Sequence, residues 1–456
     1  MSRRSSLSRR RFLRLGAGGS VALASAGALG PGPWSMLSAR TSAAAGGDDY
    51  RALVCVFLLG GADSANLIVP RSEEAYATYA ASRKVLAVSR ETLLPITPLT
   101  GQGADYGLHS MVPELAQRFD EGSLAFVANV GPLVQPITKE QFPDKSVPRP
   151  ARLFSHNDQQ LQRQLAYADS PHGRGWGGRI ADRVSHVNGE TPLPMNISLG
   201  GRVPMLMGET SFPYSMSAAG SESLLAMEPG SRRREVFDAL LESRGHILED
   251  GYSRTQREAM EIDALVSNAL DSAPSFQGLF PVNVRIAEQL RMVAQLISVR
   301  GALEAKRQIF FVAMEGFDTH MQQNTLLPPL FRDLSRSLDA FQRALESIGA
   351  ASSVTTFTSS EFGRTLSSNS SGSDHGWGNH AMVLGANVRG GDIYGTMPDL
   401  TLDGPDDLGG GRIIPTLSED QYAATLARWF GLSEPVLGTV FPNLAKFSAA
   451  DLGFLA

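Results

Sequence analysis

The chain has 456 residues, of which 42% are hydrophobic, enough to bury the core of one large domain or two ordinary ones. Only 19% of the residues are charged and the formal net charge is −5, so no nucleic-acid partner is expected. The single cysteine, Cys55, excludes an intramolecular disulfide and a cysteine-based zinc cluster.

The first 47 residues are predicted to be an export signal followed by a linker. Residues 8–14 read Ser-Arg-Arg-Arg-Phe-Leu-Arg, which matches the twin-arginine export pattern. The Gly- and Ala-rich apolar stretch 15–29 that follows is too short for a stable membrane span. We therefore expect the twin-arginine machinery to export a folded protein, residues 48–456, to the periplasm or the extracellular space.

A continuous apolar run at residues 52–59 begins the predicted fold. Runs of this kind are typical of parallel strands that are buried on both faces. The run ends in Gly60 and Gly61, and Asp63 follows just past the predicted strand end. Asp63 is interpreted either as the cap of a turn or as a metal ligand, and position alone does not decide between the two.

The next elements follow in the order of a βαβ unit. An amphipathic helix is predicted at 109–121 and an apolar strand at 123–131. Further strands are expected at 195–199, 309–314, 353–360 and 379–385, and further helices at 282–299, 330–348 and 416–431. Residues from about 200 to 280 are rich in turns and charge, and are predicted to form an insertion or a cap over the site.

Ser155 and His156 precede a helix-like stretch, residues 159–167. A hydroxyl at a helix start lies beside unpaired N–H groups, which suits an N-cap. The same position also suits a nucleophile, because the positive end of the helix dipole favours a nearby anion. Both interpretations of Ser155 stay open at this point.

Polar residues able to bind a metal follow two of the predicted strands. The first strand is followed by Asp318 and His320, whose side chains point the same way in an extended segment. The second strand is followed by Glu361, and Asp374 and His375 come soon after it. Nitrogen and oxygen ligands without thiolates suit zinc, manganese or iron, and a larger share of carboxylates suits calcium or magnesium.

Five segments together resemble an exported bacterial family filed as domain of unknown function 1501. These segments are residues 58–70 (LLGGADSANLIVP), Ser155-His156, 316–320 (GFDTH), 360–364 (SEFGR) and 374–376 (DHG). The family is similar in fold to the alkaline phosphatase and sulfatase superfamily. The resemblance implies a three-layer α/β sandwich, with a central, mostly parallel sheet and metals at the strand C-termini.

The resemblance also implies roles for individual residues. Metal ligands of the superfamily are matched by Asp63, Asp318, His320 and His375, with Asp374 beside the last of them. The nucleophile is matched by Ser155. An Asp-His pair of the superfamily falls where this chain has Glu361 and Phe362. Glu361 can replace the aspartate, whereas Phe362 cannot bind a metal, so a complete second metal is not expected.

These residues predict an exported hydrolase of phosphate or sulfate esters that uses a divalent metal, zinc ahead of calcium, magnesium or manganese. Ser155 would attack the ester and His156 or His375 would assist proton transfer. Arg364 would bind an ester oxygen, or else form a salt bridge with a carboxylate. The alternative is a catalytically eroded binding or assembly protein on the same fold. The resemblance further implies a second exported protein of unknown function as a partner.

Overall fold

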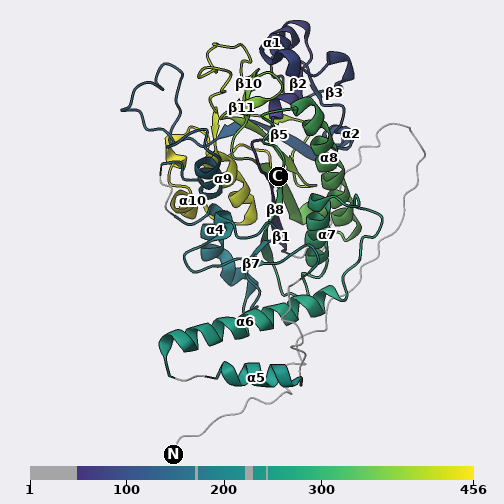
Figure 1. The fold of residues 1–456 in the computed structure, drawn as a ribbon, viewed down its shortest axis with the longest axis vertical. Coiled ribbons are helices and arrows are strands. Elements are labelled where there is room, and N and C mark those ends of the chain that lie inside the picture. Colours follow the sequence, from purple (N-terminus) through teal and green to yellow (C-terminus); the bar gives the residue numbers. More distant parts are fainter. Residues whose placement is uncertain (1–48, 170–172, 221–229, 243–244) are drawn as a thin grey trace, which may run out of the picture. The chain divides into compact units, whose positions relative to one another are not determined.

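The strand β1 (Arg51–Leu58) lies inside the main sheet of the computed structural model (Figure 1). Successive side chains of a strand point to opposite faces of its sheet. Val54 and Val56 therefore join one hydrophobic core, while Cys55 and Phe57 join another on the opposite face. Because both faces of β1 are buried, its sequence is a continuous apolar run and does not alternate.

The main sheet has the strand order β13-β5-β12-β9-β1-β8-β6-β7, and β14 pairs with β5. Its other strands are β5 (Leu124–Gly131), β6 (Asn196–Ser198), β7 (Tyr214–Ser215), β8 (Arg307–Met314), β9 (Val354–Ser359), β12 (Asn379–Leu384), β13 (Ile393–Tyr394) and β14 (Leu417–Ser418). β12 pairs antiparallel with β5 and β9, and the other pairings of this sheet are parallel. The predicted mostly parallel sheet is confirmed.

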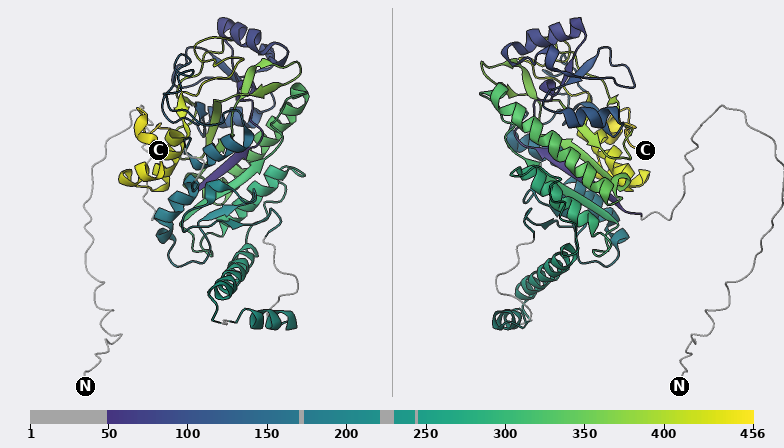
Figure 2. Two further views of the ribbon diagram at one scale, coloured as in Figure 1. Left: turned by 60° about the vertical axis from the view of Figure 1, so that its left-hand side comes forward. Right: turned by 90° about the vertical axis from the view of Figure 1, so that its right-hand side faces the viewer.

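Helices cover both faces of this sheet, as Figures 1 and 2 show. One core contains side chains of α2 (Pro113–Asp120), α7 (Arg285–Ser298) and α8 (Gln323–Ser347). The other core contains side chains of α4 (Trp176–Val184), α9 (Glu419–Phe430) and α10 (Glu434–Val440). The predicted three-layer α/β sandwich is thus confirmed.

Two small sheets and two further helices lie near the C-terminal ends of β1, β8 and β9. They are β2 (Ile68–Pro70), β3 (Leu94–Ile96), β4 (Tyr106–Leu108), β10 (Arg364–Ser368), β11 (Ser373–His375), α1 (Glu73–Arg83) and α3 (His156–Leu165). β10 and β11 pair antiparallel, with Arg364 opposite His375. This hairpin brings the chain back to the end of β9, so that His375 of β11 lies there.

The region predicted as an insertion or cap contains α5 (Arg232–Leu240) and α6 (Ile247–Leu270). Val266 and Ala269 of α6 are buried in the core that contains α7, whereas α5 has no buried residue. That this region forms a cap over the site stays a prediction.

The structure describes residues 49–169, 173–220, 230–242 and 245–456. Residues 48–456 form one compact unit. The twin-arginine motif at residues 8–14 lies outside the described residues, so the export signal stays a prediction. None of the helices within the described ranges has the length and apolar character needed to cross a membrane.

Candidate metal centre

The C-terminal ends of three neighbouring parallel strands form the candidate site. Gly60 follows β1, Asp318 follows β8 and Glu361 follows β9. Ligand sites of open α/β sheets lie at such ends. The Gly60 N–H donates to Glu361 Oε1 at 2.8 Å. Gly60 has a φ of +116°, and a Cβ there would lie 2.3 Å from the Asp318 nitrogen, so only glycine allows these strand ends to approach so closely.

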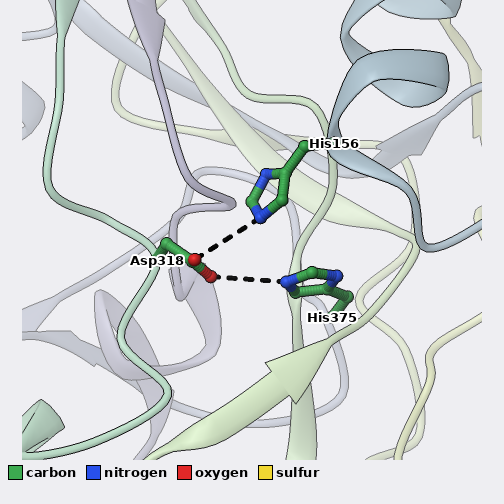
Figure 3. Close-up of side chains that lie close together, drawn as sticks. All are labelled: His156, Asp318 and His375. Carbon is green, nitrogen blue, oxygen red and sulfur yellow. Dashed lines mark hydrogen bonds and ion pairs between the residues drawn. The ribbon is translucent and has the colours of Figure 1, made fainter.

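His156, Asp318 and His375 converge on one point (Figure 3). The Nε2 atom of His156 lies 3.5 Å from Asp318 Oδ2, and the Nε2 atom of His375 lies 3.3 Å from Asp318 Oδ1. Two ligands that each lie about 2.1 Å from one tetrahedral ion are about 3.4 Å apart. The spacing of these three side chains therefore fits a single metal ion.

Both histidines are held through Nδ1. His156 Nδ1 lies 2.9 Å from Glu361 Oε1, and His375 Nδ1 lies 2.8 Å from the carbonyl oxygen of Phe154. A carboxylate or carbonyl oxygen accepts, so each Nδ1 carries a proton and each Nε2 faces Asp318. Metal-binding histidines are typically oriented in this way.

A third imidazole, His320, adjoins this group. Its Nε2 lies 3.1 Å from Asp318 Oδ1 and 2.9 Å from His375 Nε2, and its Nδ1 lies 3.2 Å from Asp374 Oδ1. Because Asp318 and His375 both direct lone pairs at His320 Nε2, a positive charge is needed among them. A second proton on His320 would supply it, and so would a metal cation.

Two pKa shifts favour the metal-binding protonation states. Burial alone would raise the pKa of Asp318, but the hydrogen bond and charge of Arg364, with smaller effects of His320 and His156, lower it overall. Burial lowers the pKa of His375 and outweighs the opposing hydrogen bond to Phe154. A metal binds the ionised carboxylate and the neutral imidazole, so both shifts extend binding toward lower pH.

Asp374 lies at the outer edge of the site, with 52% of its side chain exposed. Hydrogen bonds from Asn369 and then from His320 lower the pKa of Asp374. Its oxygen accepts from the ring of His320 and holds that ring toward Asp318. The structure thus places Asp374 behind His320 and outside the group of His156, Asp318 and His375.

Glu361, predicted from sequence as a ligand, is fully buried and its Oε1 is already engaged. That atom accepts from the Gly60 N–H, from His156 Nδ1 and from Gln160 Nε2 at 3.0 Å. Its place in the structure is behind His156, as the acceptor that orients the ring.

Arg364 adopts the salt-bridge alternative of the sequence prediction. Its Nη1 lies 2.8 Å from Asp318 Oδ1 and 3.1 Å from the carbonyl oxygen of Gly60, and its Nη2 donates to the carbonyl oxygen of Ser373. The side chain is fully enclosed. A guanidinium held in this way orients Asp318.

Asp63, the predicted ligand after β1, lies in a different network. It is 1% exposed and forms an ion pair with Arg83 of α1, and its Oδ2 also accepts from Gln323 Nε2 at 2.5 Å. The structure does not bring it into the group around Asp318. Its partner could not be found from sequence, because nothing local in residues 73–83 indicates which helix face turns toward Asp63.

Phe362 occupies one side of the site. Its ring stacks on His375 at 4.6 Å between centroids and lies 4.9 Å from the ring of His156. The residue is 1% exposed. Phe362, which the sequence analysis identified as unable to bind a metal, therefore packs its apolar ring against both histidines.

Ser155 is the N-cap residue of α3, between two residues that contact the site. The Phe154 carbonyl accepts from His375, and His156 faces Asp318. The Ser155 hydroxyl donates to Asp158 Oδ2 at 2.7 Å and does not cap the helix. The sequence indicated a proton-transfer role for His156 and did not reveal that its ring faces Asp318. The available signal was its position directly before a helix.

The described donor set comprises three imidazoles and one carboxylate, the mixture that suits zinc better than calcium or magnesium. The three histidines and Asp318 are 22% to 45% exposed, so the centre is open to solvent on one side. The arrangement can bind one cation.

A family model described as "Protein of unknown function (DUF1501)" matches residues 50–440. No curated protein matches the chain. Three similar solved structures are the PsFucS1 sulfatase from Pseudoalteromonas sp., the soluble domain of lipooligosaccharide phosphoethanolamine transferase A from Neisseria meningitidis, and a 2-O GAG sulfatase.

The identities to these three structures are 9%, 8% and 9%, and the TM-scores are 0.35, 0.33 and 0.32. The matches cover 89%, 84% and 86% of this chain, and 72%, 88% and 74% of the other chains. At these values the matches do not establish a shared chemistry.

Proposed function

The chain belongs to the DUF1501 family of proteins of unknown function, and we propose that it is a metal-dependent hydrolase of phosphate or sulfate esters. The observation that carries this proposal is the orientation of three histidines. His156, His320 and His375 each have an oxygen acceptor at Nδ1 and each direct Nε2 at Asp318. Such anchored rings are typical of a metal centre, since an isolated surface histidine needs no fixed tautomer.

His156, Asp318 and His375 would hold the metal, as three protein ligands do in catalytic zinc sites, and zinc is the ion that we propose. When bound, such an ion neutralises charge on the ester oxygens and favours attack by a hydroxyl. Phosphate and sulfate esters fit this centre because their reactions place negative charge on oxygens beside the cation.

Ser155 is the proposed nucleophile. Its hydroxyl would attack phosphorus or sulfur, the ester alcohol would leave, and water would hydrolyse the covalent serine intermediate. Ser155 lies between Phe154 and His156, both of which contact the centre. The start of α3 adds unpaired N–H groups that favour the anionic substrate.

The twin-arginine motif at residues 8–14 supports export to the periplasm or beyond as part of this proposal. A second exported protein of unknown function is the proposed partner, as the family resemblance implies. The described residues do not identify the surface that would contact it.

A second candidate function is a non-catalytic exported binding protein that keeps one metal for structure. Two observations favour it. Phe362 stacks against His375 where a second-metal ligand would be needed, and Asp63 is committed to Arg83. A centre with one metal can still catalyse hydrolysis, but it loses the second cation that would share the charge of the leaving and attacking oxygens.

Metal analysis of the purified mature protein, with a screen of aryl phosphates and aryl sulfates, tests the proposal. We expect about one zinc ion per chain, and turnover that is lost in Ser155→Ala while the metal is retained. His375→Ala should lose both the metal and the activity, whereas His186→Ala, outside the centre, should lose neither. Stoichiometric metal without turnover would favour the binding protein, and a metal-free, inert protein would refute both candidates.

A further inference from the structure

We propose that Asp158 is the general base that removes the proton from Ser155, a role that rests on the function proposed above. The Ser155 Oγ donates to Asp158 Oδ2 at 2.7 Å. This contact joins the proposed nucleophile directly to a carboxylate, with no water or imidazole between them. A general base must lie within such hydrogen-bonding reach of the proton it removes.

The contact differs from ordinary helix capping. A capping serine accepts from a backbone N–H of the first helical turn. Ser231 does so from Arg234, and Ser418 does so from Gln421 in a full capping box. Ser155 has no such bond, and its hydroxyl points its proton at Asp158 instead. Ser72, Ser89 and Ser433 are also N-cap serines without a capping bond, and Ser89 donates to Glu91, so the distinguishing feature of Ser155 is a carboxylate contact next to a histidine that faces Asp318.

The nearby histidines are already occupied. His156 donates through Nδ1 to Glu361 and turns Nε2 toward Asp318. His375 donates through Nδ1 to Phe154 and likewise turns Nε2 toward Asp318. Neither ring therefore has a nitrogen left for Ser155. The sequence had suggested these histidines for proton transfer, and the geometry points to Asp158.

The second oxygen of Asp158 lies close to the positive charge of Arg152, which leaves the carboxylate partly exposed to solvent. Asp158 Oδ1 lies 3.5 Å from Nη1 of Arg152, whose side chain is 80% exposed. Exposed ion pairs of this kind contribute little to stability. Asp158 is itself 25% exposed, so water can reach it to carry the proton away. The position of Asp158 beside Ser155 is therefore better explained by chemistry at Ser155 than by a contribution to the stability of the fold.

The Ser155 O–H bond breaks and its proton moves to Asp158, while Oγ forms a bond to phosphorus or sulfur. The ester bond breaks and its electron pair leaves with the alcohol oxygen, which takes up the proton from Asp158 through solvent. In the second half, water attacks the serine ester, one of its protons passes to Asp158 and then returns to Ser155 Oγ. The sum is an ester plus water giving an alcohol plus phosphate or sulfate.

The test measures the reactivity of Ser155 without relying on ester turnover. The full exported protein is treated with diisopropyl fluorophosphate, and modification of Ser155 is followed by intact mass and peptide mapping as a function of pH. We expect Asp158→Asn to slow labelling by about 10²-fold or more, as loss of a general base does. Asp158→Glu should restore part of the rate, because it keeps a carboxylate base at this position.

Glu249→Gln is the matched control, because it removes an exposed carboxylate from the first turn of α6. It should label at the wild-type rate. Metal content and thermal unfolding of each variant show whether the fold and the centre survive. Wild-type labelling in Asp158→Asn, or no labelling of Ser155 in the wild-type protein, would overturn the inference. Labelling that depends on Asp158 in a protein that hydrolyses no ester would keep the inference and refute the proposed function.

Discussion

His156 Nδ1 lies 2.9 Å from Glu361 Oε1, and this contact joins the start of α3 to the end of β9 across 205 residues of sequence. Glu361 is fully buried and also accepts from the Gly60 N–H. A buried carboxylate that faces an imidazole fixes both the tautomer and the direction of the ring. The direction in which the His156 ring faces Asp318 is therefore set from inside the sheet.

Glu361→Gln should weaken metal binding without removing a direct ligand. The amide can still accept one hydrogen bond, but it lacks the negative charge that increases the basicity of His156. Loss of such a supporting carboxylate typically costs about 10- to 100-fold in metal affinity. Competition with a zinc-binding dye measures the change. Exposed Glu304→Gln is the control, and unchanged affinity in Glu361→Gln would show that the contact does not orient the ring.

Phe362→His should not create a second metal site. The new imidazole would stand alone, because Asp63 remains paired with Arg83 and Glu361 remains engaged with Gly60 and His156. A structural or catalytic metal needs at least three protein ligands. Elemental analysis of the dialysed protein should still give one ion per chain. Two ions per chain would mean that Asp63 can leave Arg83 and act as a ligand.

The architecture could be predicted well because it follows from local patterns. The apolar runs at residues 52–59 and 123–131 correspond to β1 and β5, both buried along their length. The helix α8 extends further than expected, from Gln323 instead of residue 330. Pro328 and Pro329 argue against a helix in sequence, yet both lie inside α8.

The site could be predicted only in part, because its contacts link distant segments. The alternation of Asp318 and His320 correctly indicated a shared side, and their ligand atoms are 3.1 Å apart. The pairing of Asp63 with Arg83 depends on how α1 packs, and the role of His156 depends on Glu361, 205 residues away. No short-range pattern encodes either contact.

Asp420 should make the protein less stable as the pH rises. Burial raises the pKa of Asp420 from 3.8 to about 7, with an opposing hydrogen bond from Asn443 and a further increase due to Glu419. The folded state therefore binds more protons than the unfolded state between pH 3.8 and about 7, and the free energy of unfolding falls across that window. The full difference corresponds to about 4 kcal/mol as an upper bound.

Asp420→Asn should remove this dependence, since the amide keeps an acceptor for the Asn443 N–H without ionising. Urea unfolding at pH 5 and pH 8 measures it. The variant should exceed the wild-type free energy of unfolding slightly at pH 5, where the wild-type protein has already lost part of this stabilisation, and by a larger amount at pH 8. The exposed Asp120→Asn serves as the control. An equal pH dependence in the wild-type protein and Asp420→Asn would contradict the assignment.

Asp63→Asn should lower stability and leave metal binding intact. Asp63 is buried against Arg83 and Gln323, and its Oδ1 has no hydrogen-bond partner. Removing one charge of a buried pair leaves the other uncompensated, which costs about 3 kcal/mol or more. Unfolding by urea should show this loss, while zinc content stays at one ion per chain.

Asp318→Asn is the matched comparison, and it should lose zinc because Asp318 faces all three histidines. Loss of zinc at unchanged stability in Asp63→Asn would instead make Asp63 a ligand, and the centre would then have to rearrange when metal binds.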